Sequence, residues 1–433
     1  MAVTATRLGS SPMTLDWTQM RITHKYDPES FAEVWSQLKD RFASREVGFY
    51  DAPVDSELSD IQACQELAAQ VLQNPQISDC LFLGIGGSAL GPISLLSALR
   101  EKCSTRIRFH FLENPDPLEW KSTLASLRPD STLVCSVTKS GTTFETMAQT
   151  LLALQWLGRE RWKTHFVAIT DPKKGDLRQF ASDEGLKTLS IHPSIGGRFS
   201  VFSSVGLFPA ALAGLSLDSF LAGAAQIREY MDKCPGEKNP IFILADEFIR
   251  QYPKRSTHVC MPYSTRLKSL GAWFVQLWGE SLGKDGKGFN PLAALGATDQ
   301  HSILQLLRDG PDDKVTFFIT VDHVEDPISI PKVSAGAGQW KTYPAFKILE
   351  GHSLHELMGI EQRSIALVLS RQTRPSLTIR LDRLDEKSMG AVFFFFSVLT
   401  AFTGEKWGVN PFDQPGVEEG KVYIREALSQ QRD

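Results

Sequence analysis

Short apolar runs alternate with longer amphipathic stretches in two separate parts of this chain. In the first part, the apolar runs are typical of buried strands, and the stretches between them repeat apolar residues at helical spacing. The predicted strands read DCLFLGIG, RIRFHFLEN, STLVCSVT and THFVAIT, and the predicted helices read GPISLLSALR, PLEWKSTLASL, TFETMAQTLLALQWL and GDLRQFASDEG. Because strands alternate with helices, we predict a parallel sheet that is covered on both faces.

The second part begins after a long helical section that includes FSSVGLFPAALAGL and NPIFILADEFIRQY. Its predicted strands read STHVCMPY, KVTFFITV and SLTIRLD, with helices through LGAWFVQLWGESLG and near 346–357. The simplest account is an α/β protein of two domains joined near 215–240. Residues 1–55 show one clear pattern only, an amphipathic stretch near Phe31–Phe42.

Composition and charge argue against several classes of protein. Apolar residues make up 42% and charged residues 22% of the 433 residues, which is enough for large buried cores. The net charge of −4 gives no reason to expect nucleic acid or an acidic membrane surface as a partner. The longest apolar run, 390–402, is shorter than the ~20 residues that span a bilayer, which favours a buried helix or a subunit contact.

The cysteines and the N-terminal residues indicate a compartment. The six cysteines are scattered, without a CxxC motif or a metal-ligand spacing, and several lie in strand-like apolar runs. We therefore expect reduced, buried thiols. The N-terminal residues contain no apolar segment flanked by basic residues, so we predict no secretory signal and expect a cytoplasmic protein.

Glycines follow a strand in LFLGIGGSALGP, where Gly84, Gly86 and Gly87 precede Ser88. Two interpretations fit this stretch. It is either a plain strand-to-helix turn, in which glycine permits an unusual backbone, or a loop whose N–H groups and Ser88 hydroxyl bind an anion. The stretch alone does not decide between them, and it lacks the GxxxxGK[ST] pattern of a nucleoside-triphosphate loop.

A second loop, SVTKSGTTFET, also follows a strand and supports the anion interpretation. Its polar residues, at the point where a helix should begin, are Thr138, Lys139, Ser140, Thr142 and Thr143. A helix N-cap accounts for one or two of these hydroxyls, but not for four of them beside a lysine. Since helix N-termini offer free N–H donors and partial positive charge, we predict that this loop binds phosphate.

Two further segments suit the stabilisation of charge and the transfer of a proton. Arg198 follows two glycines in SIGGRFSVFSS, where a cation brought close over a bare backbone stabilises negative charge on oxygen. Gln276 and Glu280 are four residues apart in FVQLWGESLGKDGKG and share one face of a predicted helix. A carboxylate among apolar neighbours is a candidate general base. A surface arginine and a solvated helix-end glutamate are the alternative readings of these residues.

The remaining candidates have ordinary structural explanations when taken singly. His301 lies just inside a predicted helix in GATDQHSILQLLRDGP, with Thr298 or Asp299 as its cap. Gln414 and Lys421 in VNPFDQPGVEEGK are seven residues apart, which places them on roughly one face of a helix that begins at Pro415. The other histidines lack a third ligand at a metal-like spacing, so we assign no metal.

Six of these stretches together resemble the glucose-6-phosphate isomerase family, also called phosphoglucose isomerase. They are LFLGIGGSALGP, SVTKSGTTFET, GGRFSVFSSVGL, QLWGESLGK, GATDQHSILQLL and NPFDQPGVEEGK. They occur in that family's order and extend over about residues 80–425, and the length is similar to that of the shorter bacterial form. The first 55 residues carry no part of the resemblance.

The resemblance implies a pair of sugar-isomerase (SIS) domains, each a three-layer α/β/α unit with a mainly parallel sheet, and helical segments at both ends. On this basis we expect an N-terminal segment over 1–57, a first domain with the phosphate-binding loops over 58–220, and a second domain with a C-terminal helix over 221–433. The family implies a homodimer that uses neither a metal nor an organic cofactor.

The resemblance also assigns roles by motif. Glu280 would move the proton between C2 and C1 of the sugar, with Gly197 and Arg198 at the reacting carbons. His301 of one subunit would help open the sugar ring in the partner's site, and Lys421 would assist at the ring oxygen. The residues implied to hold and position the phosphorylated sugar are Gly87, Ser88, Thr138, Lys139, Ser140, Thr143, Gln276 and Gln414.

The activity implied is the reversible isomerisation of glucose 6-phosphate and fructose 6-phosphate in glycolysis and gluconeogenesis. It proceeds by ring opening and proton transfer through an enediol. This reaction needs a base, a fixed positive charge and a phosphate-binding site away from the reacting carbons. Two alternatives stay open. One is a bifunctional glucose/mannose phosphate isomerase, and the other is a non-catalytic SIS-type sensor of sugar phosphates, which could lack Glu280 or His301.

Overall fold

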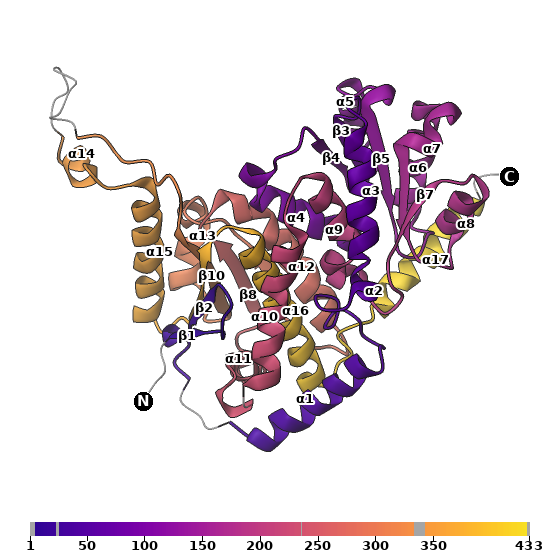
Figure 1. Cartoon of the computed structure of the whole chain (residues 1–433). Helices are drawn as coiled ribbons and strands as arrows, with labels where there is room; N and C mark the ends of the chain where they lie inside the picture. Colours follow the sequence, from indigo (N-terminus) through magenta and orange to yellow (C-terminus); the bar gives the residue numbers. More distant parts are fainter. Residues whose placement is uncertain (1–4, 23–25, 235, 333–342, 431–433) are drawn as a thin grey trace.

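The computed structural model describes residues 5–22, 26–234, 236–332 and 343–430, and it has two lobes, each with a sheet at its centre (Figure 1). The first lobe contains a five-stranded sheet in the order β4-β3-β5-β6-β7, and all neighbouring strands are parallel. Its strands are β3 (Asp79–Leu83), β4 (Arg108–Leu112), β5 (Thr132–Val137), β6 (Phe166–Thr170) and β7 (Lys187–Ser190). Every residue of β3, β5 and β6 is buried, which explains why most residues of these strands are apolar.

Helices connect and cover the strands of the first lobe. They are α3 (Ile61–Gln73), α4 (Leu90–Ala98), α5 (Pro117–Ala125), α6 (Phe144–Leu157), α7 (Trp162–His165), α8 (Asp176–Asp183) and α9 (Ser204–Leu212). The order of strands and helices confirms the predicted alternation. The short strand β7 was not predicted, because only one of its four residues is buried and it lacks an apolar run.

The second lobe contains a six-stranded sheet in the order β1-β2-β11-β10-β8-β9. Its strands are β1 (Ala5–Arg7), β2 (Met13–Asp16), β8 (Thr257–Pro262), β9 (Asn290–Ala293), β10 (Lys314–His323) and β11 (Ser376–Arg383). The last four run parallel to one another, whereas the β1–β2 hairpin is antiparallel at the edge. β1 and β2, which belong to the predicted N-terminal segment, therefore extend the second sheet, although they lie far from β11 in the sequence.

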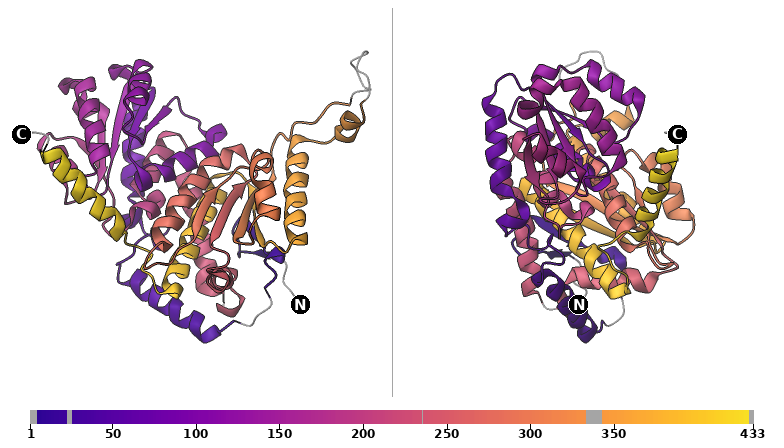
Figure 2. Two further views of the ribbon diagram at one scale, coloured as in Figure 1. Left: turned by 180° about the vertical axis from the view of Figure 1, so that it is seen from behind. Right: turned by 90° about the vertical axis from the view of Figure 1, so that its right-hand side faces the viewer.

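The helices that accompany the second sheet include the longest in the described chain. They are α1 (Pro28–Ala43), α10 (Leu217–Lys233), α11 (Pro240–Gln251), α12 (Lys268–Leu282), α13 (Gln300–Asp309), α14 (Pro344–Leu349), α15 (Leu354–Arg371), α16 (Glu386–Trp407) and α17 (Pro415–Gln430). The short helix α2 (Ser56–Ser59) instead contacts α3 of the first lobe. α14 projects away from the rest of the second lobe, and α17 ends on the side that carries the first sheet (Figures 1 and 2). α1 covers the expected amphipathic stretch and begins at Pro28, with Asp27 as its N-cap.

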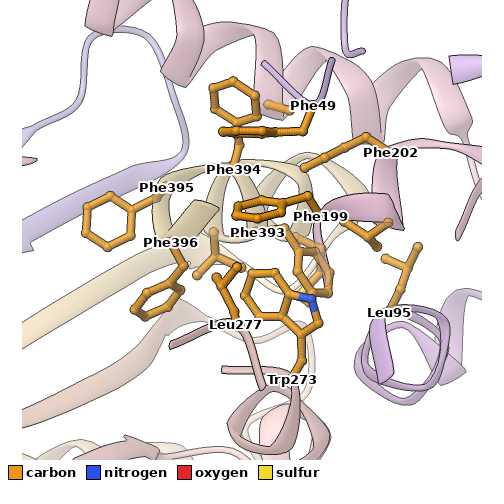
Figure 3. Close-up of a cluster of buried hydrophobic side chains, with 14 of the residues drawn as sticks. Phe49, Leu95, Phe199, Phe202, Trp273, Leu277, Phe393, Phe394, Phe395 and Phe396 are labelled. Carbon is orange, nitrogen blue, oxygen red and sulfur yellow. The ribbon is translucent and has the colours of Figure 1, made fainter. Parts of the chain in front are cut away.

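Helix α16 passes through the centre of the molecule. It is long and apolar enough to cross a membrane, but 94% of its most apolar window is buried inside the protein. Its phenylalanines pack against residues of both lobes (Figure 3). Phe393 meets Trp273 edge to face at 4.6 Å between ring centroids, and Phe394 lies 6.1 Å from Phe49. The buried-helix interpretation of 390–402 is thus confirmed.

The prediction of one continuous helix near 346–357 is wrong. The stretch near 346–357 forms two helices, α14 and α15, which are interrupted at residues 350–353. Gly351 has φ of +79°, a conformation that does not continue a helix. Ser353 then starts α15 with a capping box, because its hydroxyl accepts from the Glu356 N–H and the Glu356 carboxylate accepts from the Ser353 N–H.

The prediction that the cysteines are free thiols is confirmed. All six cysteines are free; four of them are buried and two are half-buried, Cys103 and Cys234.

Candidate active site

The two glycine and hydroxyl loops lie at the carboxyl ends of neighbouring strands. β3 runs into a 3-10 turn, η2 (Gly86–Ser88), and β5 runs into the loop before α6. Because β3 and β5 are paired in parallel, both loops lie at one edge of the first sheet. This is the edge at which open parallel sheets bind their ligands.

The hydroxyl groups of the second loop form a cluster of their own. Thr138 Oγ1 lies 2.8 Å from Thr143 Oγ1, and Ser140 Oγ lies 3.4 Å from both. Thr143 is the N-cap residue of α6, but its side chain makes no capping hydrogen bond. The hydroxyls therefore do not serve the cap, and the first N–H groups of α6 receive no side-chain acceptor from that residue. Such a helix start suits an anion.

Lys139 links this loop to the segment that precedes the Arg198 turn. Its Nζ donates to the backbone oxygen of Pro193 at 2.6 Å. Burial lowers the pKa of the Lys139 ammonium, and the charge of Asp171 acts in the opposite direction. Lys139 therefore serves as a bridge between two loops of the candidate site.

The first loop packs directly on the Arg198 turn. That turn is a 3-10 segment, η6 (Gly197–Phe202), and Ser200 Oγ donates to the Gly87 backbone oxygen at 3.1 Å. A Cβ at Gly87 would overlap the carbonyl of Gly197 and lie 2.6 Å from the Arg198 nitrogen. The close approach of the two backbones therefore requires glycine at position 87, whether or not a ligand binds there.

Arg198 is buried at the junction of three segments. Its guanidinium has five N–H donors, and each has a protein acceptor. Nε donates to Ser281 Oγ at 2.7 Å, and Nη1 donates to Glu280 Oε2 at 3.2 Å and to Gln414 Oε1 at 2.9 Å. Nη2 donates to the backbone oxygens of Pro411 and Asp413, at 2.6 and 2.9 Å.

The charge of Arg198 is held in place by its surroundings. Its side chain is only 2% exposed. Burial lowers the pKa of the Arg198 guanidinium, and the neighbouring Glu280 carboxylate opposes that shift. An arginine stays charged through such a shift, so the site contains a fixed, desolvated positive charge.

Glu280 and Gln276 share one face of α12, as their spacing predicts. Gln276 Nε2 donates to Glu280 Oε1 at 3.1 Å, so one carboxylate oxygen is held by Gln276 and the other by Arg198. The Glu280 side chain is 31% exposed. Gln276 also reaches the first loop, because a Cβ at Gly86 would lie 2.8 Å from its Nε2. α12 thereby joins the second lobe to the loop that contains Ser88.

Two of the predicted residues lie on other helices, α13 and α17. His301 is exposed in the first turn of α13, and among the described contacts none joins it to Arg198 or Glu280. Asp299 precedes α13, but its carboxylate accepts from the Leu295 N–H instead of capping the helix. Lys421 lies half-buried on α17, which begins at Pro415 as expected.

The sequence did not indicate several contacts that hold the site together. Ser281, Lys284 and the 410–414 segment surround Arg198 and Glu280, and a cavity of about 390 Å³ lies between Glu280, Lys284 and Gln414. Ser281 and Lys284 lie within the QLWGESLGK stretch, but a serine and a lysine beside a helix end carry no signal of their own. Among the described residues, no group of three His, Cys, Asp or Glu side chains is arranged to hold a metal ion.

Comparison with known proteins shows that this chain is similar to glucose-6-phosphate isomerases. The chain is 40% identical over 378 residues to a glucose-6-phosphate isomerase from Rubrobacter xylanophilus, and the match covers 84% of this chain and 86% of that protein. It is 36% identical to a hypothetical protein from Thermus thermophilus of known crystal structure, with a TM-score of 0.82 and coverage of 93% and 97%. A glucose-6-phosphate isomerase from Chlamydia trachomatis has the same fold, with a TM-score of 0.83 at 22% identity, over 99% of this chain and 90% of that one.

The two lobes, their parallel sheets and the loops between them define an α/β protein of the SIS type. A family model described as phosphoglucose isomerase matches residues 69–433, which is most of the chain. The chain therefore belongs to the phosphoglucose isomerase family. The fold class and the family expected from the six sequence stretches are confirmed, whereas the domain boundaries and the roles of single residues stay predictions.

Proposed function

We propose that this chain interconverts glucose 6-phosphate and fructose 6-phosphate, with Glu280 as the base that carries the proton between C2 and C1. The observation that carries the proposal is the Glu280 carboxylate, which is held between Gln276 and the buried Arg198. A carboxylate with both oxygens fixed abstracts a proton from a defined direction. Arg198 Nη1 lies 3.2 Å from that carboxylate. Because its N–H donors already have protein acceptors, its fixed charge stabilises the oxygen charge of the enediolate through space.

The phosphate of the sugar binds at the carboxyl edge of the first sheet. Ser88 contacts it from one loop, and the Thr138, Ser140 and Thr143 hydroxyls contact it from the other. The hydroxyl cluster and the start of α6, where the N-cap side chain makes no capping hydrogen bond, support this assignment. Binding energy from this remote group then orients the carbons that react.

Ring opening requires an acid and a base at the sugar ring oxygen and its neighbouring hydroxyl. Under this proposal His301 and Lys421 supply them, while Gln414 and Gln276 position the substrate. His301 is exposed on α13, so it reaches the site of a second subunit, and the active protein is a cytoplasmic homodimer. The exposed Leu306 on the same helix supports a subunit contact there.

A coupled assay tests the activity. The purified chain is expected to convert fructose 6-phosphate to glucose 6-phosphate in the presence of a metal chelator. Turnover of mannose 6-phosphate as well would favour the bifunctional alternative. Binding of sugar phosphates in calorimetry without turnover would instead favour a sensor and contradict the proposal.

Mixed dimers test the placement of His301. Glu280→Gln and His301→Ala homodimers are both expected to be nearly inactive. If His301 acts in the partner's site, unfolding and refolding the two variants together creates dimers with one intact site, and about a quarter of the wild-type activity returns at random pairing. No recovery would show that His301 serves its own chain or is not catalytic.

A further inference from the structure

Lys284 is an almost buried lysine just after the end of α12, four residues beyond Glu280, and its side chain is only 10% exposed. An ammonium group has three N–H donors. Lys284 Nζ donates to the backbone oxygens of Ser281, at 3.2 Å, and of Asn410, and it lies 3.1 Å from Asp413 Oδ1. Three protein acceptors thus occupy three donors, so Lys284 is not arranged to contact a substrate itself.

Two of the three acceptors of Lys284 belong to the segment that also holds Arg198. Residues 410–414 give Lys284 the Asn410 carbonyl and the Asp413 carboxylate. The same five residues give Arg198 the carbonyls of Pro411 and Asp413 and the side chain of Gln414. The segment is braced internally, because Asn410 Nδ2 donates to Asp413 Oδ2 at 2.8 Å. Two cations, one just after α12 and one on η6, therefore hold it from two sides.

We propose that Lys284 is a positioning residue for the isomerisation: it sets the place of the 410–414 segment and thereby aligns Arg198 and Gln414 with Glu280. This inference rests on the proposed function. An ion pair to Asp413 and a hydrogen bond to the Asn410 carbonyl fix the segment more narrowly than packing alone. A displacement of about 1 Å at reacting groups costs on the order of 10²-fold in rate.

A buried lysine can also contribute to stability alone, and Lys406 provides the matched control. Its side chain is 12% exposed, its Nζ lies 3.3 Å from Asp246 Oδ1, and it donates to Ser30 Oγ at 3.0 Å. These partners belong to α1 and α11, away from Arg198. Lys284→Met and Lys406→Met should therefore lower the melting temperature to a similar degree.

The two variants should differ in catalysis. We expect Lys284→Met to lower kcat about 30-fold to 100-fold with KM changed less than about threefold, and Lys406→Met to keep kcat within about twofold of wild type. Asp413→Asn keeps the size of the side chain and should lower kcat about fivefold. When it is combined with Lys284→Met, the loss should not exceed that of Lys284→Met alone.

A readout independent of activity separates this inference from the proposed function. Amide hydrogen exchange over 409–414 should speed up at least about tenfold in Lys284→Met and stay unchanged in Lys406→Met. Unchanged exchange, or a folded Lys284→Met variant with kcat within about twofold of wild type, would overturn the inference. If Lys284→Met does not fold, unchanged exchange and kcat in Asp413→Asn would overturn it equally. An inactive wild type refutes the function, while the exchange result still decides the role of Lys284.

Discussion

The two lobes contribute different kinds of groups to the candidate site. The first sheet presents two loops of backbone and small hydroxyl side chains at its carboxyl edge. The second lobe and the segment after α16 present long polar side chains, Gln276, Glu280 and Gln414, around the buried Arg198. The first set suits a phosphate, which is bound by many N–H and O–H donors, and the second suits proton transfer, which needs a few groups at fixed distances.

The amino ends of the strands in both sheets carry ion pairs, whereas the site loops follow the carboxyl ends in the first sheet. At the amino ends of β3 and β4, Asp79 accepts two hydrogen bonds from Arg108. At the amino ends of β8, β10 and β11, Asp312 binds three cations. The carboxyl edge of the first sheet carries the loops of the site. Substitutions at the two edges should therefore have different consequences, for the reaction at one edge and for folding at the other.

The largest effect is expected for Glu280→Gln, which removes the base and keeps the shape. We expect kcat to fall by roughly 10²- to 10⁴-fold, with sugar phosphate still bound in calorimetry. Glu184→Gln is the matched control, because the Glu184 side chain is 29% exposed and pairs with Arg159. Glu184 is the C-cap residue of α8, in the lobe that does not contain α12. An active Glu280→Gln variant would show that another residue is the base. The proposed role of the second lobe in proton transfer would then be wrong.

Gly87→Ala tests whether the Ser88 loop and the Arg198 turn meet as closely as the structure indicates. An added Cβ overlaps the Gly197 carbonyl and forces the Ser88 loop away from Arg198. We expect kcat/KM to fall about 10²-fold. Gly196→Ala is the control in the same region, since its Cβ would meet only Phe199, at 3.5 Å. Equal activity of both variants would mean that the contact between the loops is not needed.

Ser140→Ala sharpens the division between binding and chemistry. The Ser140 hydroxyl belongs to the cluster of the first lobe, so its loss should raise KM about tenfold and change kcat much less. Ser122→Ala is the control, because the Ser122 hydroxyl donates to the Glu119 carbonyl of its own helix. A fall in kcat with unchanged KM would argue that the hydroxyl loop takes part in the reaction and not only in binding.

The sequence predicted most of the first lobe because three of its strands, β3, β5 and β6, are buried on both faces. Apolar runs such as 79–83 and 132–137 are easily recognised, and the loops that follow them contain unusual sets of glycines and hydroxyls. The same reasoning missed β7 and β9, which are short and partly exposed. It could not place the β1–β2 hairpin beside β11, because pairing over such a separation leaves no local signal.

The site residues were found by motif, but their mutual contacts were not. Spacing along one helix was enough to bring Gln276 and Glu280 together. Nothing in the spacing connects Arg198 with Ser281, Pro411 or Asp413, since those contacts depend on how α12, η6 and the 410–414 segment pack. Lys284 was overlooked for the same reason. Its importance comes from three acceptors that only the folded chain assembles.

The smallest catalytic effect is expected for Asp312→Asn, at the amino edge of the second sheet. The Asp312 side chain is 23% exposed and lies 2.8 to 3.1 Å from Lys254, Arg255 and Arg374. Burial raises the pKa of the Asp312 carboxyl, but the hydrogen bonds from these three cations outweigh it, and the net pKa is well below the ordinary value. The substitution should cost roughly 1–3 kcal/mol of unfolding free energy at pH 7 and leave kcat and KM unchanged.

The pH dependence of that loss follows from the direction of the shift. A carboxyl whose pKa is lowered by folding stabilises the folded state above its ordinary pKa of about 4, and this contribution is lost as the pH falls through the folded-state value. The stability gap between wild type and Asp312→Asn in urea unfolding should therefore be full at about pH 7 and shrink below about pH 4. Asp322→Asn, with a single arginine partner and 24% exposure, should show a smaller gap. A gap that persists unchanged at about pH 3 would mean that packing, and not the charge of Asp312, ties the three strands together.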